Sequence, residues 1–199
     1  MTRILVLKSS IMSGKSQTNA LIDDFLAQRR SRGERDEVVM RDLASLDLPV
    51  LDSELFYALR GAENPGERAS KVVALSDTLV AELKSCDLLL IGAPMYNLNV
   101  PTHLKNWFDL VARAQVTFQY TQTYPKGLVE SVKAIAFSSR GGVHAGQQTD
   151  AVTPYLRAVL GLMGITDVRF VYAEGLDIKP HGVEAGLASA REQMQALHA

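Results

Sequence analysis

The sequence predicts an α/β fold, in which a parallel sheet carries helices on both faces. Five short apolar runs have the character of strands, and stretches with apolar residues at helical spacing lie between them. The 199 residues are enough for one domain with some surplus, at about 150 residues per domain, so we expect residues 1–199 to form one domain. Connections between consecutive parallel strands are expected to be right-handed.

The five predicted strands are short and rich in branched apolar side chains. The run at residues 4–7 is bounded by Arg3 and Lys8, as expected of a buried strand. Residues 88–91 are apolar throughout, which makes this run the best candidate for the centre of the sheet. The full set is 4–7, 37–41, 87–92, 132–138 and 167–173.

The predicted helices are marked by apolar stripes. Gly33 lies beyond the end of the first helix, and Pro101 suits the first turn of the third. The stripes are Leu21, Ile22, Phe25 and Leu26; Val72, Leu75, Leu79 and Leu83; Leu104, Trp107, Phe108 and Val111; and Tyr155, Val159 and Leu162, with a closing helix over 182–197. Residues 42–66 hold several Pro and Gly breakers and are predicted to be irregular.

Residues 114–130 interrupt the alternation of strands and helices. Val116, Phe118 and Tyr120 alternate with polar residues, which is typical of a strand or hairpin. We expect this insertion to lie on the surface. Because five aromatic side chains fall within residues 107–124, it is a candidate substrate face.

Composition excludes several classes of function. Lys and Arg total 21 against 22 Asp and Glu, so the net charge is −1, which disfavours a nucleic-acid binder. The single cysteine, Cys86, excludes an internal disulfide framework and a zinc site built from several cysteines. No apolar run approaches the roughly 18 residues of a membrane helix, and the amino-terminal apolar run is too short for a signal peptide. We therefore expect no membrane association and a cytoplasmic location.

Ligands of open α/β sheets bind beyond the carboxyl ends of the strands, so the loops after strands 1, 3 and 4 are the candidate site. In the first loop, Gly14-Lys15-Ser16 resembles the second half of a nucleotide-binding P-loop, but Ser9 stands where that motif needs glycine. No acidic residue ends the neighbouring apolar strands to hold magnesium, so a nucleotide hydrolase is the weaker alternative. The hydroxyls of Ser10, Ser16 and Thr18 beside a helix start favour phosphate binding. Ser16 could equally be a plain helix cap.

The other two loops suit a flat ring. Backbone amides of residues 93–99 could hydrogen-bond a ring edge while Met95 and Tyr96 pack on its face; the alternative is an ordinary turn. Gly141-Gly142 allows close backbone approach to a ligand, and His144 could orient an acceptor or relay a proton. His144 could also be an ordinary surface histidine, and Arg140 is interpreted as a structural anchor for these loops.

Other chemistries lack their motifs. The sequence has no G-x-G-x-x-G for a dinucleotide, no G-x-S-x-G for acyl hydrolysis, and no metal-ligand spacing among its four histidines. We therefore predict no metal site. A phosphate loop, a ring-edge loop and a glycine pair together suit a mononucleotide with a large flat ring, such as FMN.

In combination, several segments resemble the FMN-dependent NADH azoreductases, bacterial enzymes related to the quinone oxidoreductases. The resemblance runs from about residue 3 to about residue 176, and the segments are Leu5-Val6-Leu7-Lys8-Ser9-Ser10 with Ser16-Gln17, Ala93-Pro94-Met95-Tyr96-Asn97, Leu104-Lys105-Asn106, Phe108-Asp109-Leu110-Val111-Ala112-Arg113-Ala114, Val116-Thr117-Phe118, Ser139-Arg140-Gly141-Gly142-Val143-His144 and Gly164-Ile165-Thr166-Asp167. It implies a flavodoxin-like fold, a three-layer α/β/α sandwich with strand order 2-1-3-4-5. It also implies a homodimer with one FMN per subunit at the dimer interface, which reduces quinones and azo dyes with NADH or NADPH.

The resemblance assigns roles to particular positions. FMN would contact Ser10, Ser16, Gln17 and Thr18 through its phosphate, Met95, Tyr96, Asn97 and Leu98 through its ribityl chain and ring, and Ser139, Arg140, Gly141 and Gly142 around the ring. Leu98 replaces a common phenylalanine, Thr18 a common serine, and Lys15 and Leu162 stand at variable positions.

The implied mechanism is ping-pong, with donor and acceptor occupying the same place in turn. Phe118 and Tyr120 would sandwich flat substrates together with residues of the second subunit, Arg60 would contact dinucleotide phosphates, and Leu162 would line the substrate site. We assign the catalytic roles to His144 and Tyr120. The alternative, a flavodoxin-type electron carrier, is disfavoured because such carriers are strongly acidic and this chain carries −1.

Overall fold

The computed structural model describes residues 1–197 and is built around one parallel sheet. Its strands are β1 (Thr2–Lys8), β2 (Asp36–Asp42), β3 (Leu88–Gly92), β6 (Lys133–Ser139) and β7 (Val168–Ala173). They pair in the order β2-β1-β3-β6-β7, all parallel. Since β6 and β7 are the fourth and fifth strands of this sheet, the predicted order 2-1-3-4-5 is confirmed.

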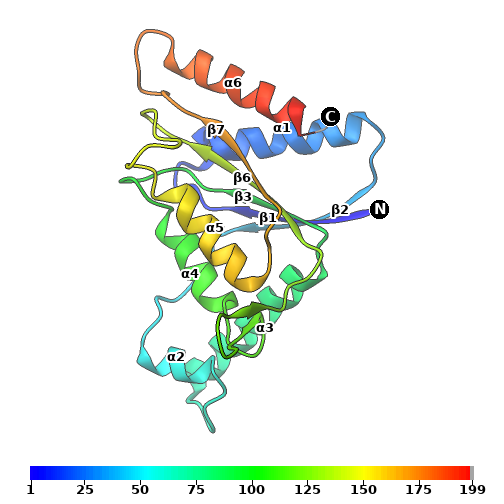
Figure 1. The fold of residues 1–199 in the computed structure, drawn as a ribbon, viewed down its shortest axis with the longest axis vertical. Helices are drawn as coiled ribbons and strands as arrows, with labels where there is room; N and C mark the ends of the chain where they lie inside the picture. Colours follow the sequence, from blue (N-terminus) through cyan, green and yellow to red (C-terminus); the bar gives the residue numbers. More distant parts are fainter. Residues whose placement is uncertain (198–199) are drawn as a thin grey trace.

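Helices cover both faces of the sheet, which confirms the three-layer prediction (Figure 1). On one face lie α1 (Gln17–Ser31) and α6 (Gly182–Ala196), and on the other α3 (Glu67–Ser85), α4 (Thr102–Val111) and α5 (Val152–Met163). The alternation along β1 shows why: Ile4 and Val6 join the core under α1 and α6, whereas Leu5 and Leu7 join the core under the other three helices.

Residues 42–66, predicted to be irregular, contain a short helix. This helix, α2 (Ser53–Ala58), begins where Oδ1 of Asp52 accepts a hydrogen bond from the Leu55 amide at 2.9 Å. Leu55 and Ala58 are buried against Ala69 of α3. The prediction was wrong because six residues are too few to show a helical period among so many breakers.

The predicted insertion forms a small antiparallel hairpin, β4 (Phe118–Gln119) and β5 (Lys126–Gly127). One detail differs from the expected alternation: polar Thr117 is fully buried, because its hydroxyl donates to the Val111 carbonyl (2.6 Å) and accepts from the Arg113 amide (2.9 Å). Phe118 is also buried, at 5% exposed, whereas the tip of the hairpin is exposed, with Tyr120 at 60% and Tyr124 at 81%. The predicted surface position is therefore confirmed for residues 120–126, but Thr117, Phe118 and Val129 are buried.

None of the helices within residues 1–197 combines the length and the apolar character needed to cross a membrane.

Candidate active site

Three loops meet at the carboxyl edge of the sheet, on the left-hand side of Figure 1. The Ser9 hydroxyl donates to the Gly92 carbonyl at 2.5 Å, and the hydroxyls of Ser10 and Tyr96 lie 3.0 Å apart, which joins the first loop to the second. The second is joined to the third because the Met95 amide donates to the Ser139 carbonyl at 2.9 Å. The structure thus brings together the residues that the sequence predicted to hold FMN.

The first loop leads into the N-terminus of α1. Ser16 is the N-cap of this helix, since its Oγ accepts from the Asn19 amide at 3.2 Å. The Thr18 side chain is fully buried and its hydroxyl lies 3.0 Å from Ser16 Oγ, so Thr18 can serve a ligand only through its main-chain amide. The first amides of a helix have no intrahelical acceptor and carry partial positive charge. Those of Gln17 and Thr18 are therefore suited to binding an anion, which is compatible with the capping role of Ser16.

The second loop is a tight backbone turn at the end of β3. The main chains of Tyr96 and Asn99 bond to each other in both directions, at 2.9 and 3.1 Å. Between them Asn97 (φ +49°) and Leu98 (φ +67°) are left-handed. Asparagine tolerates that region, whereas a leucine there costs about 1–2 kcal/mol. The turn predicted as the alternative is therefore present, and its strain falls on Leu98, one of the predicted cofactor contacts, as strain at functional sites often does.

The third loop is tied to the segment after β7. The carbonyls of Gly141 and Gly142 accept from the amides of Asp177 (3.0 Å) and Gly175 (2.9 Å). A Cβ at Gly141 would collide with the Asp177 carboxylate, and one at Gly142 would lie 2.7 Å from Nε2 of His144. A side chain at either position would therefore displace the Asp177 carboxylate or the His144 ring. Their N–H groups have no protein acceptor within residues 1–197, so two adjacent donors remain available at the edge.

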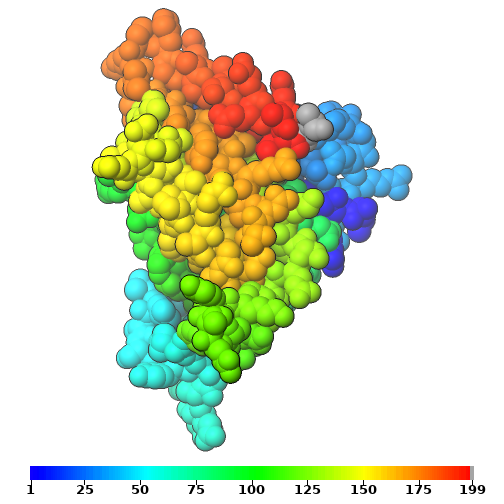
Figure 2. Space-filling model, viewed as in Figure 1, coloured from blue at the N-terminus to red at the C-terminus, as the bar shows by residue number. Residues whose placement is uncertain are grey.

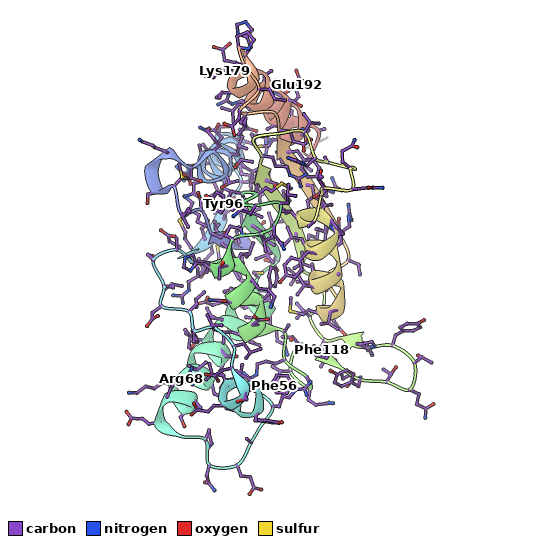
Figure 3. The ribbon with its side chains drawn as sticks, turned by 90° about the vertical axis from the view of Figure 1, so that its left-hand side faces the viewer. Phe56, Arg68, Tyr96, Phe118, Lys179 and Glu192 are labelled. Carbon is purple, nitrogen blue, oxygen red and sulfur yellow. The ribbon has the colours of Figure 1, made fainter. Side chains whose placement is uncertain are left out.

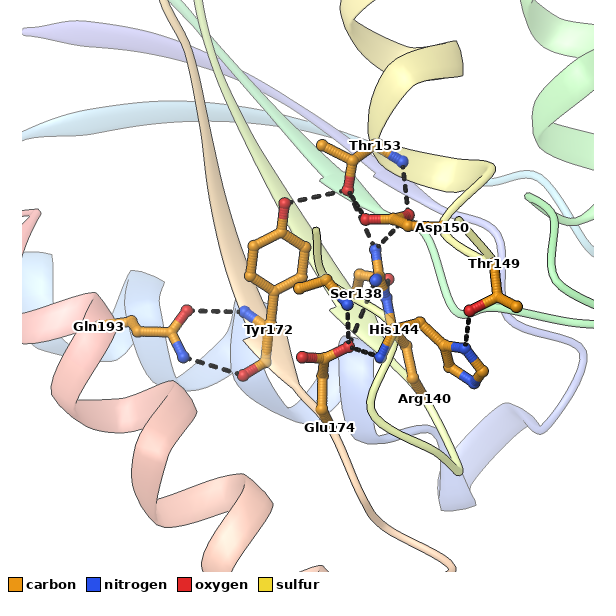
Figure 4. A network of polar contacts seen from close by, with 10 residues as sticks. Ser138, Arg140, His144, Thr149, Asp150, Thr153, Tyr172, Glu174 and Gln193 are labelled. Carbon is orange, nitrogen blue, oxygen red and sulfur yellow. Dashed lines mark hydrogen bonds and ion pairs between the residues drawn. The ribbon is translucent and has the colours of Figure 1, made fainter. Parts of the chain in front are cut away.

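Arg140 lies at the centre of a buried polar network (Figure 4). Its guanidinium is fully buried, lies 3.1 Å from the Asp150 carboxylate and 3.3 Å from that of Glu174, and stacks over the Tyr172 ring at 4.7 Å. Burial alone would raise the pKa of Asp150, yet hydrogen bonds from Thr153 and Arg140 outweigh burial and hold this pKa below its ordinary value.

These contacts agree with the interpretation of Arg140 as a structural anchor. The guanidinium also donates to the hydroxyls of Ser138 and Thr153, both at 3.1 Å, while the Arg140 amide donates to the Ala173 carbonyl. A contact between Arg140 and a cofactor remains a prediction. The network itself was missed by sequence reasoning because Asp150 and Glu174 approach Arg140 only in the folded chain.

His144 is half-buried and held at two points. Its amide donates to Oε1 of Glu174 at 2.7 Å, and its Nδ1 lies 2.8 Å from the hydroxyl of Thr149. The same Glu174 oxygen accepts from the Ala145 amide at 2.7 Å. His144 is thus fixed beside the glycine pair. This is the position that a residue acting on a ring bound at the glycine pair would need.

A second cluster gathers the predicted substrate residues. Arg60 donates to the hydroxyl of Tyr120 at 3.2 Å, and the rings of Tyr120 and Phe118 meet edge to face at 5.4 Å. The Arg60 guanidinium lies 4.3 Å from the ring centre of Phe56, a residue that sequence reasoning missed. In the sequence, Phe56 and Arg60 are four residues apart, a spacing that brings two side chains together only where the chain is helical. The helix over 53–58 was not predicted, so the contact was not predicted either. A cavity of about 110 Å³ lies beside this cluster, between Phe56, Arg60 and Phe118.

Arg113 connects the segments that carry this cluster. It donates to the carbonyl of Leu59 at 3.1 Å and to the hydroxyl of Ser76 at 3.0 Å, and it pairs with Asp77. Leu59 precedes Arg60, and the Arg113 amide bonds to Thr117 in the hairpin. Figure 2 shows the α2 segment in cyan against the hairpin in green.

Within one chain the two clusters lie apart. Figure 3 shows Tyr96 near the middle of the long axis, with Phe56 and Phe118 toward its lower end. His144 and Tyr120, both predicted to be catalytic, have different partners: Tyr120 contacts Arg60 and Phe118, and His144 contacts Glu174 and Thr149. Leu162 is half-buried near the end of α5.

Comparison with known proteins decides the family. A family model described as a flavodoxin-like fold matches residues 2–197. The chain is 73% identical over 199 residues, 100% of both sequences, to "FMN-dependent NADH:quinone oxidoreductase 4" of Burkholderia lata. This chain belongs to the flavodoxin-like FMN-dependent NADH:quinone oxidoreductases.

Other members of this family and their structural neighbours agree. An Aeromonas salmonicida protein named "FMN-dependent NADH:quinone oxidoreductase" is 56% identical over 197 residues, 99% of each sequence. The crystal structure of an azoreductase from Bacillus anthracis superposes with a TM-score of 0.88 at 26% identity, covering 98% of both chains. A second structure from that organism, an FMN-dependent NADH-azoreductase in complex with FMN, has a TM-score of 0.83 at 19% identity, covers 99% of both chains, and supports the fold alone.

Proposed function

We propose that this chain is an FMN-dependent enzyme that transfers two electrons from NADH or NADPH to quinones and, reductively, to azo compounds. Donor and acceptor would use the same place in turn, and the enzyme would act in the cytoplasm as a homodimer with one FMN per subunit. The observation that carries this proposal is the convergence of three loops and a helix N-terminus at one sheet edge, in a chain 73% identical to a named oxidoreductase.

The residues present fit FMN. Ser10 and the first amides of α1 would hold its phosphate, and the strained turn carrying Leu98 would lie along the ribityl chain and ring. The amides of Gly141 and Gly142, which have no acceptor among residues 1–197, would donate to the ring edge, where negative charge develops on reduction. When bound, FMN supplies the chemistry of hydride acceptance and return. The protein contributes position and charge.

His144 would hold or move a proton at this edge. Its Nε2 lies beside the α-carbon of Gly142, so the imidazole borders the space that the ring would occupy. An imidazole can hold a proton on either ring nitrogen, which suits it to a proton relay during reduction of an acceptor.

A second copy of the chain would complete the site. The cluster of Arg60, Phe118 and Tyr120 does not reach the edge of its own sheet, so we propose that the partner's cluster covers this edge. Four exposed apolar side chains of the edge loops would meet the partner: Ile11, Met12, Leu98 and Val143.

The decisive experiment is anaerobic spectroscopy of the purified protein. We expect a yellow protein with flavin absorption that bleaches on adding NADH and recovers on adding a quinone. Cleavage of one azo bond should consume two equivalents of NADH, because it takes four electrons. A folded protein unable to take up FMN would refute the proposal, whereas FMN bound but reduced only through a partner protein would favour the electron carrier.

Mixing two inactive variants tests the shared site. Gly142→Val damages the edge and Tyr120→Ala damages the cluster, so a hybrid dimer contains one intact site. We expect activity to reappear when subunits are exchanged after mild denaturation. Mixtures that stay inactive although hybrid dimers are detected by mass spectrometry would contradict a site made by two subunits.

A further inference from the structure

The ring of His144 has a hydrogen-bond partner that the proposed chemistry does not use. Nδ1 lies 2.8 Å from Oγ1 of Thr149, and both residues belong to the loop before α5 (Figure 4). Nε2, the other ring nitrogen, points to the glycine pair, since a Cβ on Gly142 would lie 2.7 Å from it. The imidazole is therefore held with one nitrogen on Thr149 and the other at the edge of the site.

This contact also bears on where the proton of a neutral ring resides. A hydroxyl has one proton to donate, and within residues 1–197 His144 Nδ1 is the acceptor that the structure provides for Thr149. If Thr149 donates to Nδ1, Nδ1 carries no proton, so the proton of the neutral ring lies on Nε2. The bond made by one ring nitrogen sets the protonation of the other.

The loop geometry keeps Thr149 in place. Its two ends are anchored: the amide of His144 donates to Glu174, and Asp150 pairs with buried Arg140 at 3.1 Å. Between these anchors the amide of Gln147 donates to the His144 carbonyl at 2.9 Å, and the Asp150 amide donates to the Gln147 carbonyl at 3.0 Å. These hydrogen bonds within the loop hold the hydroxyl of Thr149 next to Nδ1 of His144.

We propose that Thr149 is a positioning residue for His144, which fixes the imidazole with Nε2 toward Gly142 and its neutral form protonated on Nε2. The proposal rests on the proposed function of His144, because it gives that residue a defined donor atom facing the ring site. Thr149 itself touches neither cofactor nor substrate in this assignment.

Nitrogen NMR of histidine-labelled protein tests the proposal without turnover. At a pH where the ring is neutral, with and without FMN, we expect the His144 ring of the parent protein to be protonated on Nε2. Thr149→Val should give a mixture of both tautomers, and Thr149→Ser should restore the single form. An Nδ1-protonated ring in the parent protein, or a ring unchanged in Thr149→Val, would overturn the proposal.

A double-mutant cycle separates positioning from a structural role. Thr149→Val should slow quinone reduction about two- to tenfold, the range expected for one lost hydrogen bond, and Thr149→Ser should recover the rate. In a His144→Ala background the same Thr149→Val change should have no further effect. An equal loss in both backgrounds would show that Thr149 only supports the loop and would refute positioning. Thr78→Val, which removes an exposed hydroxyl bonded to its own helix, is the matched control.

The two proposals fail in different ways. Absence of FMN binding or of reduction by NADH refutes the proposed function, while the tautomer of His144 is still measured in the same protein. Normal activity with no response of the ring or of the rate to Thr149→Val refutes the positioning role alone.

Discussion

Replacement of Glu174 measures how strongly the buried network holds the loop after β6. One oxygen of this carboxylate accepts from the amides of His144 and Ala145, both at 2.7 Å, and lies 3.3 Å from the Arg140 guanidinium. The Glu174 side chain is 17% exposed and that of Arg140 is fully buried, so solvent screens these contacts little. Two variants divide the effect: Glu174→Gln removes the charge and keeps an acceptor, whereas Glu174→Ala removes both.

The expected losses follow from these contacts. Hydrogen bonds to a charged group contribute about 1.5–3 kcal/mol each, and neutral ones about 1 kcal/mol. Arg140 keeps Asp150 as a partner in both variants, which limits the loss. We therefore expect Glu174→Gln to lower the free energy of unfolding by about 2 kcal/mol. Glu174→Ala should lower it by about 3–5 kcal/mol, because the His144 and Ala145 amides lose their acceptor and the buried Arg140 guanidinium loses one of its two carboxylate partners.

Urea unfolding followed by circular dichroism measures both values. The exposed Glu184, which lies beside His181 on the surface, provides the control, and Glu184→Gln should change stability by less than about 0.5 kcal/mol. Two results would refute the view that this carboxylate anchors the loop. One is a free energy of unfolding for Glu174→Gln within about 0.5 kcal/mol of the parent value. The other is the same free energy of unfolding for Glu174→Gln and Glu174→Ala.

Three further outcomes are expected. Arg113→Ala should lower the free energy of unfolding by about 2–3 kcal/mol and expose residues 42–66 to limited proteolysis, since Arg113 holds the Leu59 carbonyl; a protease-resistant segment would contradict this. Burial raises the pKa of the Cys86 thiol to about 11, so thiol reagents should label it only on unfolding, and rapid labelling of the folded protein would show that the site opens. The pKa of Asp150 is lowered in the folded state. Ionised Asp150 therefore adds to the free energy of unfolding above the unfolded pKa of about 3.9, and this stabilisation is lost as the pH falls through the folded pKa. Asp150→Asn should therefore be less stable than the parent at neutral pH and should lose less stability on acidification, as urea midpoints at both pH values will show.

The sequence predicted the sheet well because its signal is local. Each strand contains a short apolar run, and β1 alternates between the two cores from Ile4 to Leu7, so the strands could be located from the pattern. Their order was implied by the resemblance to a known family. The three edge loops followed in turn, because parallel strands all end at the same edge.

The features that were missed depend on contacts between distant residues. Phe56 meets Arg60 only because six residues form a helix that the neighbouring breakers hide. Thr117 is buried because two backbone groups satisfy its hydroxyl, which a hydrophobic pattern cannot show. The partners of Arg140 lie 10 and 34 positions along the chain and approach it only once β6 and β7 have paired.

The link made by Arg113 has a consequence for how this protein can change over evolutionary time. Arg60 lies in residues 42–66 and Tyr120 in residues 114–130, and these two segments contact each other and are joined to α3 through Arg113. The loops at the carboxyl edge, in contrast, directly follow strands of the sheet. An exposed position such as Phe56 can therefore vary without disturbing the hydrogen bonds among the edge loops. In the proposed enzyme, substitutions in residues 42–66 and 114–130 could therefore change the preferred acceptor while the edge loops that would hold the cofactor keep their hydrogen bonds.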